Sequence, residues 1–251
     1  MQTKQPEIVI EMNRLIEAAT ARKIHLRAIG GLAVQTHNKG DHPIFIREYP
    51  DLDFVVQKKQ RREFEAFMQE VGFLPNKQFN LLNGSQRQIY YDKETGLRID
   101  VFVGDFEMCH KIPLEDRLHL DPITIPLTEL LLSKAQIVEL NRKDSLDIIS
   151  VLLYNETGKD DNGKINLDHI AYLCSQDWGL YKTTSINLKR VEDMVINEDL
   201  HLSSDERDLV LRRLREIELT FKEMAKPLAW QLRDRVGTRV RWYTEVEEVA
   251  R

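Results

Sequence analysis

The chain has 251 residues, a formal net charge of −5, 42% hydrophobic residues and 31% charged residues. This composition is typical of a folded globular protein with one large domain or two small ones, and it excludes a disordered chain. The acidic balance argues against indiscriminate nucleic-acid binding, which needs a basic surface, although the many lysines and arginines allow a local basic patch.

The cysteines and the N-terminus bear on the cellular compartment. Cys109 and Cys174 lie far apart and outside any Cys-x-x-Cys spacing, so neither a disulfide framework nor a cysteine-based zinc site is expected. The first residues, MQTKQPEIVIEMNRL, contain no sustained apolar stretch, so no signal peptide is expected. No apolar run approaches the roughly 20 residues that span a bilayer. These features predict a cytoplasmic protein that does not enter a membrane.

In the first half of the chain, helical and alternating patterns follow one another. Apolar residues recur at helical spacing between Glu7 and Ala21. The stretch from Lys23 to Ile29 alternates as a strand does and ends at Gly30 and Gly31, after which LAVQTH predicts a short helix. The next expected elements are a strand at Asp51–Gln57, a helix at Arg61–Phe73, strands at Arg87–Asp92 and Leu97–Gly104 joined by a KETG hairpin turn, and a short edge strand at Pro122–Leu127.

From Thr128 onward the chain is predicted to be helical. Helices are expected at Leu127–Leu140, Ser145–Glu156, Leu167–Asp177, Asn187–Ile196 and Asp205–Ala225. The polar stretch ETGKDDNGKINLD predicts a loop, with a possible further boundary near residues 156–166. The overall prediction is an α+β fold, in which a mixed sheet flanked by helices at residues 1–127 is followed by an all-helical region at residues 128–251.

Two carboxylates interrupt the second predicted strand. Asp51 and Asp53 are two residues apart, and side chains alternate across a strand, so both point to one face while Leu52 and Phe54 point to the other. Neighbouring carboxylates repel each other, and a bridging cation relieves that repulsion. Magnesium is the natural candidate, because it prefers carboxylate oxygens and shares its coordination sphere with substrate phosphates. Taken alone, such a pair is more often a solvated face of a strand.

A third carboxylate, Asp100, stands among the apolar residues of LRIDVFV. An unpaired charge there is costly, so Asp100 needs a metal ion, a basic group such as Arg98, or solvent at a sheet edge. If its strand neighbours the strand of Asp51, three carboxylates converge. Upstream, Gly30 and Gly31 let the backbone approach a ligand closely, and the helix that begins beside them presents N–H groups suited to phosphate. Together these residues predict a site for a nucleoside triphosphate with two magnesium ions.

The segments IGGLAV, REYPDLDF and RIDVFV together resemble the nucleotidyltransferases of the DNA polymerase beta superfamily. That family has a Gly-Gly or Gly-Ser turn, an acid-apolar-acid triplet on a strand and a third acid on a later strand. The resemblance spans residues 24–153, and the stand-alone bacterial enzymes look closest, namely abortive-infection toxins and antibiotic nucleotidyltransferases. It implies a nucleotidyltransferase fold, Asp51, Asp53 and Asp100 as catalytic magnesium ligands, and Gly30 and Gly31 as nucleotide-binding residues.

The same resemblance implies nucleotide-binding roles for Arg47, four residues before the acid pair, and for Lys134 in LLLSKAQ. Lys143 and Asp144 resemble a Lys-Asp pair of the toxin group. The chain also departs from the family pattern. Its connection at residues 36–50 is longer than in the relatives, and Leu32 follows the second glycine where relatives often carry a serine that contacts phosphate.

Several of these residues also have a simpler interpretation. Lys134 could be a solvated helix lysine whose stem covers apolar surface, and Arg47 could form a salt bridge within a loop. For Asp144 a helix N-cap is favoured over chemistry, with Asp147 in the first turn of the helix. The C-terminal stretch AWQLRDRVGTRVRWY could contact a nucleic acid by stacking and charge, but packing of its tryptophans into a helical bundle is favoured.

The sequence therefore predicts an enzyme, a magnesium-dependent nucleotidyltransferase. It would move a nucleoside monophosphate from a nucleoside triphosphate such as ATP to an acceptor hydroxyl and release pyrophosphate. The acceptor would be RNA or tRNA, or a small molecule, and a toxin–antitoxin role follows only from the resemblance. The alternative is a catalytically silent nucleotide-binding regulatory module with the same fold. The oligomeric state and the existence of an antitoxin partner are left open.

Overall fold

The computed structural model describes residues 6–40 and 42–245, and the chain divides into two compact units. The first unit comprises Met1–Thr36, Ile46–Phe106 and Pro113–Pro126, and the second comprises His37–Phe45, Glu107–Ile112 and Leu127–Arg251. The chain passes into the second unit for the last time after Pro126, and the α/β core was predicted to end at residue 127. Residues 156–166 lie inside the second unit.

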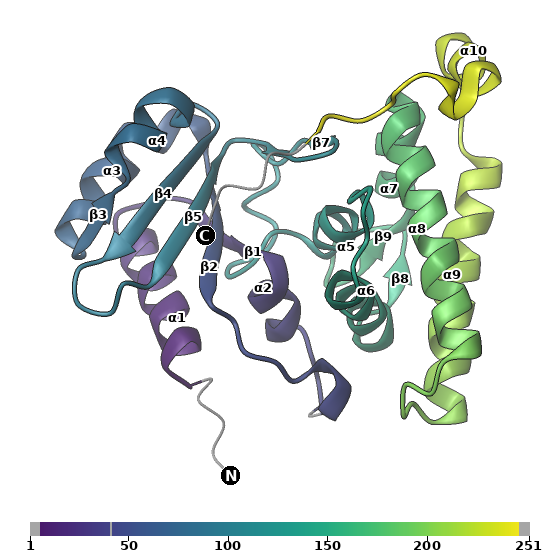
Figure 1. Ribbon diagram of the computed structural model, residues 1–251, viewed down its shortest axis with the longest axis horizontal. Coiled ribbons are helices and arrows are strands. Elements are labelled where there is room, and N and C mark those ends of the chain that lie inside the picture. Colours follow the sequence, from purple (N-terminus) through teal and green to yellow (C-terminus); the bar gives the residue numbers. More distant parts are fainter. Residues whose placement is uncertain (1–5, 41, 246–251) are drawn as a thin grey trace. The chain divides into compact units, whose positions relative to one another are not determined.

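The first unit is built on a five-stranded sheet with helices around it (Figure 1). Its elements are α1 (Pro6–Ala21), β1 (Leu26–Ile29), α2 (Gly30–Thr36), β2 (Asp51–Val56), η2 (Lys58–Gln60), α3 (Arg61–Glu70), β3 (Phe73–Pro75), α4 (Lys77–Asn83), β4 (Arg87–Asp92) and β5 (Arg98–Val103). The strand order is β1-β2-β5-β4-β3, with β2 and β5 parallel and the other neighbours antiparallel. The predicted mixed sheet and the predicted β4–β5 hairpin are therefore confirmed.

One face of this sheet forms the apolar core of the first unit. The ring of Phe64 on α3 meets Tyr90 on β4 edge to face, with 5.9 Å between the ring centroids. The strand residues on the same face are almost fully buried: Leu52, Phe54, Val56, Ile99, Val101 and Val103. Because neighbours along a strand alternate between faces, Asp51, Asp53 and Asp100 lie on the opposite face.

The second unit is mainly helical. Its elements are η1 (Pro43–Phe45), β7 (Lys111–Ile112), α5 (Leu127–Ala135), α6 (Arg142–Tyr154), β8 (Thr157–Gly158), β9 (Ile165–Asn166), α7 (Leu167–Gln176), α8 (Trp178–Asn197), α9 (Ser204–Glu223), α10 (Leu228–Val236) and η3 (Gly237–Arg239), while β6 (Phe106–Glu107) crosses the limit between the units. The predicted helical C-terminal region is confirmed, and with the mixed sheet it makes the chain α+β. Among the residues described, no helix is both long and apolar enough to cross a lipid bilayer.

Two predicted elements near the start of the second unit are wrong in extent. The helix expected to continue to Leu140 ends at Ala135, because the Asn187 side chain of α8 donates to the backbone carbonyls of Ala135 at 2.9 Å and Ile137 at 2.6 Å. Sequence periodicity carries no information about such a contact between helices. The edge strand expected at Pro122–Leu127 is reduced to an isolated bridge that joins Thr124 to β1.

The C-terminal tryptophans support the packing interpretation. Trp230 on α10 is buried, and its Nε1 donates to the carbonyl oxygen of Cys174 at 3.0 Å. Trp242 donates through Nε1 to Thr183 Oγ1 at 2.9 Å. These two rings are therefore held by hydrogen bonds within the second unit.

Candidate active site

The first unit holds six of the seven residues that the sequence singles out. The turn from β1 to α2 has no connecting residues, because the helix begins at Gly30 directly after Ile29. Gly30 has φ +81°, a left-handed conformation that side chains disfavour. A Cβ atom at this position would also lie 2.5 Å from Asp53 Oδ2. Glycine is therefore required both by the backbone and by the carboxylate that lies against it.

The second glycine accommodates a cation. A Cβ atom at Gly31 would overlap the Arg47 guanidinium and would lie 2.9 Å from Tyr49 Cε1. The guanidinium carbon of Arg47 lies 5.1 Å from the centre of the Tyr49 ring, and the Tyr49 hydroxyl donates to Gln35 Oε1 at 3.4 Å. The long connection after α2 thus returns a positive charge to the glycine turn. The structure brings Gly31 and Arg47 together.

The three aspartates meet across two parallel strands. Asp53 is paired in register with Asp100, and Asp51 is paired with Arg98. Neighbouring strands lie about 4.8 Å apart, and paired residues share a face, so the carboxylates are neighbours on the sheet. Asp51 and Asp53 are partly exposed, whereas Asp100 is only 3% exposed.

Asp100 is already engaged by two arginines. Arg87 donates from Nε to Oδ1 at 2.7 Å and from Nη2 to Oδ2 at 2.6 Å, and Arg98 Nη2 donates to Oδ2 at 3.0 Å. Burial acts to lower the pKa of Arg87, but the hydrogen bond to Asp100 and the charges of Asp100, Asp53 and Asp51 raise that pKa above its usual value. The sequence indicated Arg98 as a possible partner of Asp100, but it did not indicate Arg87.

The carboxylates fit a magnesium site only in part. Asp51 and Asp53 offer partly exposed oxygens on one face, which is the ligand chemistry that magnesium prefers. In its present contacts Asp100 does not fit a magnesium site, because both its carboxylate oxygens accept hydrogen bonds from guanidinium groups. Within residues 6–40 and 42–245, no group of three or more histidine, cysteine, aspartate or glutamate side chains is arranged to hold a metal ion. The structure therefore presents a carboxylate pair and a charge-neutralised third acid.

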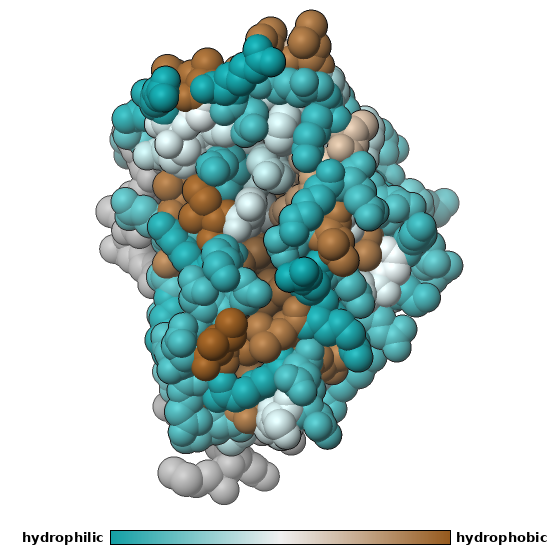
Figure 2. Space-filling model, turned by 90° about the vertical axis from the view of Figure 1, so that its right-hand side faces the viewer, coloured by the Kyte–Doolittle hydropathy of each residue, from teal (hydrophilic) through white to brown (hydrophobic). Residues whose placement is uncertain are grey.

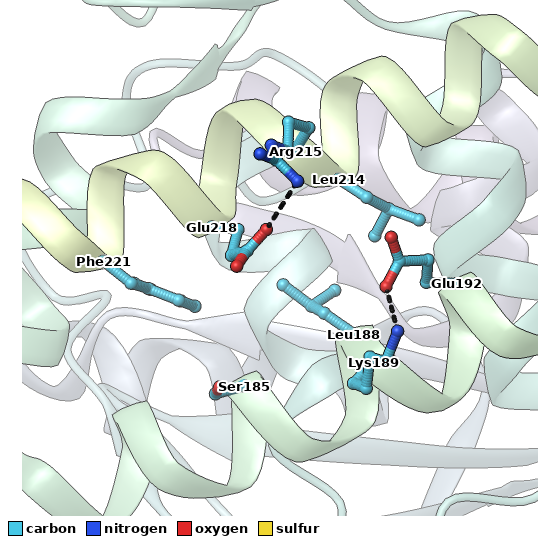
Figure 3. Close-up of a pocket in the computed structure, with 8 residues that line it drawn as sticks. All are labelled: Ser185, Leu188, Lys189, Glu192, Leu214, Arg215, Glu218 and Phe221. Atoms are coloured by element: carbon cyan, nitrogen blue, oxygen red, sulfur yellow. Dashed lines mark hydrogen bonds and ion pairs between the residues drawn. The ribbon is translucent and has the colours of Figure 1, made fainter.

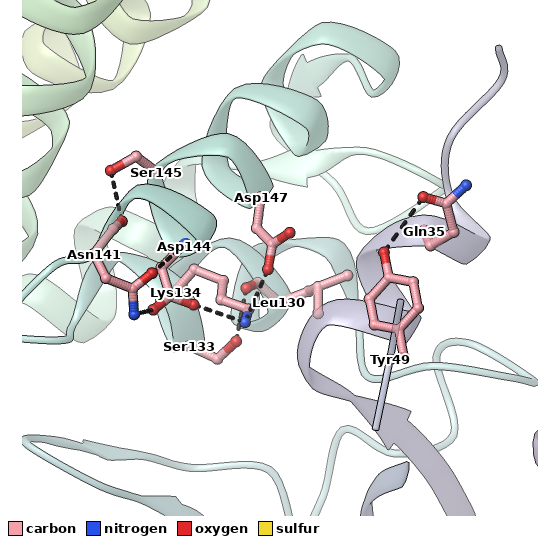
Figure 4. A network of polar contacts seen from close by, with 9 residues as sticks. All are labelled: Gln35, Tyr49, Leu130, Ser133, Lys134, Asn141, Asp144, Ser145 and Asp147. Atoms are coloured by element: carbon pink, nitrogen blue, oxygen red, sulfur yellow. Dashed lines mark hydrogen bonds and ion pairs between the residues drawn. The ribbon is translucent and has the colours of Figure 1, made fainter. Parts of the chain in front are cut away.

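The seventh predicted residue, Lys134, lies in the second unit. Its ammonium on α5 contacts Asp144 and Asp147 of α6 at 2.9 Å each (Figure 4). Burial acts to lower the pKa of Lys134, but the two carboxylates raise that pKa above its usual value. The ammonium is thus neutralised within its own unit.

The interpretation of Asp144 as the N-cap of the following helix is wrong. Helix α6 begins at Arg142, and Asn141 caps it by accepting from the backbone N–H of Asp144 at 3.0 Å. The Asn141 amide also donates to Asp144 Oδ2 at 2.7 Å, so Asp144 lies in the first turn and faces Lys134. The pairing with a lysine on another helix could not be read from local capping preferences.

The second unit also has a groove between α8 and α9, with a volume of about 350 Å³ (Figure 3). Its apolar lining consists of Leu188, Leu214 and Phe221, and its charged residues form ion pairs such as Lys189–Glu192 and Arg215–Glu218. Figure 2, which views the side of the chain formed by these helices, shows apolar residues recessed between polar ones. None of the residues predicted from the sequence lines this groove, and its rim charges are paired with one another.

Comparisons with protein-family models and with curated proteins find no match for this chain. A comparison with solved structures finds an antigenic nucleotidyltransferase-like protein from Paracoccidioides brasiliensis, with a TM-score of 0.46 and 15% sequence identity. The similarity covers 90% of this chain and 96% of that one. At this score and identity the comparison does not assign the chain to a family.

Proposed function

We propose that the chain is a nucleotidyltransferase that moves a nucleoside monophosphate from a nucleoside triphosphate to an acceptor hydroxyl, with release of pyrophosphate. The observation that carries the proposal is the position of Asp53. Its carboxylate lies against Gly30 at the start of α2 and beside Asp100 in register. Acidic groups beside a backbone turn that requires glycine are what phosphoryl chemistry uses, since phosphate oxygens need both backbone donors and cations.

Asp51 and Asp53 would hold the magnesium ions, of which two are expected. When bound, the ions supply electrostatic stabilisation of the charge that develops on the transferred phosphoryl group. Asp100 would join the site and help to deprotonate the acceptor hydroxyl once its arginine partners have released it. The proposal therefore assigns magnesium binding to Asp51 and Asp53 first, and to Asp100 only after its arginine contacts are broken.

The phosphates of the nucleotide would lie at the glycine turn. Arg47 supports this position, because its guanidinium packs against Gly31 and would neutralise the leaving pyrophosphate. Lys134 lies in the second unit, where its ammonium is already neutralised by Asp144 and Asp147. Arg47 is therefore the better supported of the two cations.

The acceptor would approach from the other side of the carboxylates. Attacking and leaving oxygens lie roughly in line in phosphoryl transfer, so an acceptor opposite the glycine turn lies over β5, β4 and β3. There Tyr91 and Leu74 are paired in register on the carboxylate face, 37% and 50% exposed, and Tyr91 is also paired with Arg98. An exposed aromatic ring beside a guanidinium suits a stacked nucleobase and its phosphate, which favours an RNA acceptor over a small molecule.

Titration calorimetry with ATP and magnesium tests the proposal. Asp53→Asn should abolish magnesium-dependent ATP binding, whereas Asp193→Asn, which removes an exposed carboxylate of α8, should leave binding unchanged. Equal binding by wild type and Asp53→Asn would contradict the site.

A transfer assay separates the enzyme from the alternative of a silent nucleotide-binding module. Incubation with each of the four labelled nucleoside triphosphates and total RNA should transfer label to RNA and release pyrophosphate. A silent module would bind ATP and release none. Pyrophosphate release without labelled RNA would instead indicate another acceptor.

A further inference from the structure

Arg87 and Asp100 form an ion pair through two hydrogen bonds at the candidate site. A bidentate guanidinium–carboxylate pair is the strong form of such an ion pair, and this carboxylate is almost fully buried. The guanidinium carbon of Arg87 also lies 5.1 Å from the centre of the Phe102 ring, which packs against Phe106 with ring centroids 4.6 Å apart. Arg87 is therefore held in place on two sides, by the carboxylate and by an aromatic ring.

The Arg87–Asp100 ion pair reduces the negative charge on the face of the sheet that carries the three aspartates. Asp53 and Asp100 are direct neighbours across β2 and β5, so two anions repel each other there. Arg87 and Arg98 offset that repulsion, because both form ion pairs with Asp100. A divalent cation that bridged Asp53 and Asp100 would have to compete with both guanidinium groups for the same carboxylate oxygens.

A phosphate group offers Arg87 an equivalent partner. The guanidinium fork matches the oxygens of phosphate as well as those of carboxylate, and charge-assisted pairs of both kinds are strong. Arg87 is partly exposed, with 23% of its side chain accessible, so an incoming anion can reach it. Exchange of the carboxylate for a phosphate would free Asp100 Oδ1 and leave Oδ2 with the Arg98 hydrogen bond alone when substrate is bound.

We propose that Arg87 is a positioning residue that withholds Asp100 from metal ions until a substrate phosphate takes its guanidinium. The inference rests on the proposed function and adds a regulation of the same site. Metal binding by Asp51, Asp53 and Asp100 together would then require bound nucleotide. Metal bound without nucleotide would then rely on Asp51 and Asp53.

Binding of Mn²⁺ alone, followed by electron paramagnetic resonance or calorimetry, tests the proposal. Arg87→Gln should bind Mn²⁺ about tenfold more tightly than wild type, because Asp100 loses its bidentate partner. Arg22→Gln is the matched control, since Arg22 forms an exposed ion pair with Glu70 at 2.8 Å in the same unit, and it should bind as wild type does. Arg87→Gln combined with Asp100→Asn should lose the gain. In wild type, added ATP should raise the Mn²⁺ affinity in the same direction.

The possible results separate the two proposals. Mn²⁺ binding that is equal in wild type and Arg87→Gln overturns the role of Arg87 and leaves the proposed function standing. No Mn²⁺ binding in any variant, with or without ATP, overturns the metal-dependent function itself. If Arg87→Gln does not fold, Arg87→Lys serves in its place, because lysine keeps the charge but not the bidentate fork. Its affinity should lie above that of wild type, and an affinity at or below wild type contradicts the inference.

Discussion

Replacing Gly30 by alanine should damage the site more than it damages the fold. Alanine at φ +81° costs roughly 1–2 kcal/mol, because L-residues disfavour left-handed backbone. For a chain of this size that cost lowers the melting temperature by about 2–8 °C. The new Cβ would lie 2.5 Å from Asp53 Oδ2 and 3.3 Å from Asp53 Cβ and Cγ, so the carboxylate has to turn away. Magnesium-dependent ATP binding should therefore fall at least tenfold.

Gly96 provides a control with the same strain and no clash. It has φ +72°, and a Cβ atom there would meet nothing within 4 Å. Gly96→Ala should show a similar drop in melting temperature by circular dichroism and wild-type ATP binding by calorimetry. The reasoning is refuted if Gly30→Ala binds ATP and magnesium as wild type does, or if both variants lose binding equally.

Two further predictions concern the stability of the second unit, measured by urea unfolding. Lys134→Met should cost about 3–5 kcal/mol, because it leaves Asp144 and Asp147 buried without their cation. Since the folded pKa of Lys134 is raised, its stabilisation should be complete below about pH 10.4 and should decline only at higher pH; a decline nearer neutrality would contradict this. Ser203→Ala should cost about 1 kcal/mol by removing the capping box of α9. The backbone and side-chain hydrogen bonds of Ser203 lower the pKa of Glu206, and Ser203→Ala removes only the side-chain part. The difference between wild type and variant should therefore be largest above about pH 4.3 and shrink only in part at lower pH, because the Ser203 hydroxyl still accepts from the Glu206 backbone N–H. A difference that does not change at all as the pH falls would contradict the side-chain bond to Glu206.

The positions of the aspartates and of the glycine turn in the first unit could be predicted from the sequence. The period of two along a strand places Asp51 and Asp53 opposite Leu52 and Phe54, whatever the neighbouring strands are. The glycine turn from β1 to α2 could likewise be expected, because Gly30 and Gly31 directly follow an alternating apolar stretch. Both are local properties, and local patterns determine them.

Contacts that depend on how strands or helices pair could not be predicted from the sequence. Arg87 reaches Asp100 because the hairpin register places Arg87 opposite Phe102, two residues along β5 from that carboxylate. Nothing in the neighbourhood of Arg87 in the sequence distinguishes it from a solvated arginine. Helix α4 was missed for a related reason: Leu81 and Leu82 are both strongly exposed, so the helix has no apolar stripe to detect.

The path of the chain between its two units has a consequence for any attempt to divide the protein. The connection at residues 37–45 belongs to the second unit, where Phe45 packs edge to face on Tyr154 and His42 Nε2 contacts the carbonyl oxygen of His201 at 3.1 Å. The chain changes unit after residues 36, 45, 106, 112 and 126. A fragment that ends at residue 126 would therefore contain the segments 37–45 and 107–112, which belong to the second unit. No single cut therefore separates the two units, and a truncation that keeps one unit intact has to remove segments from more than one place in the chain.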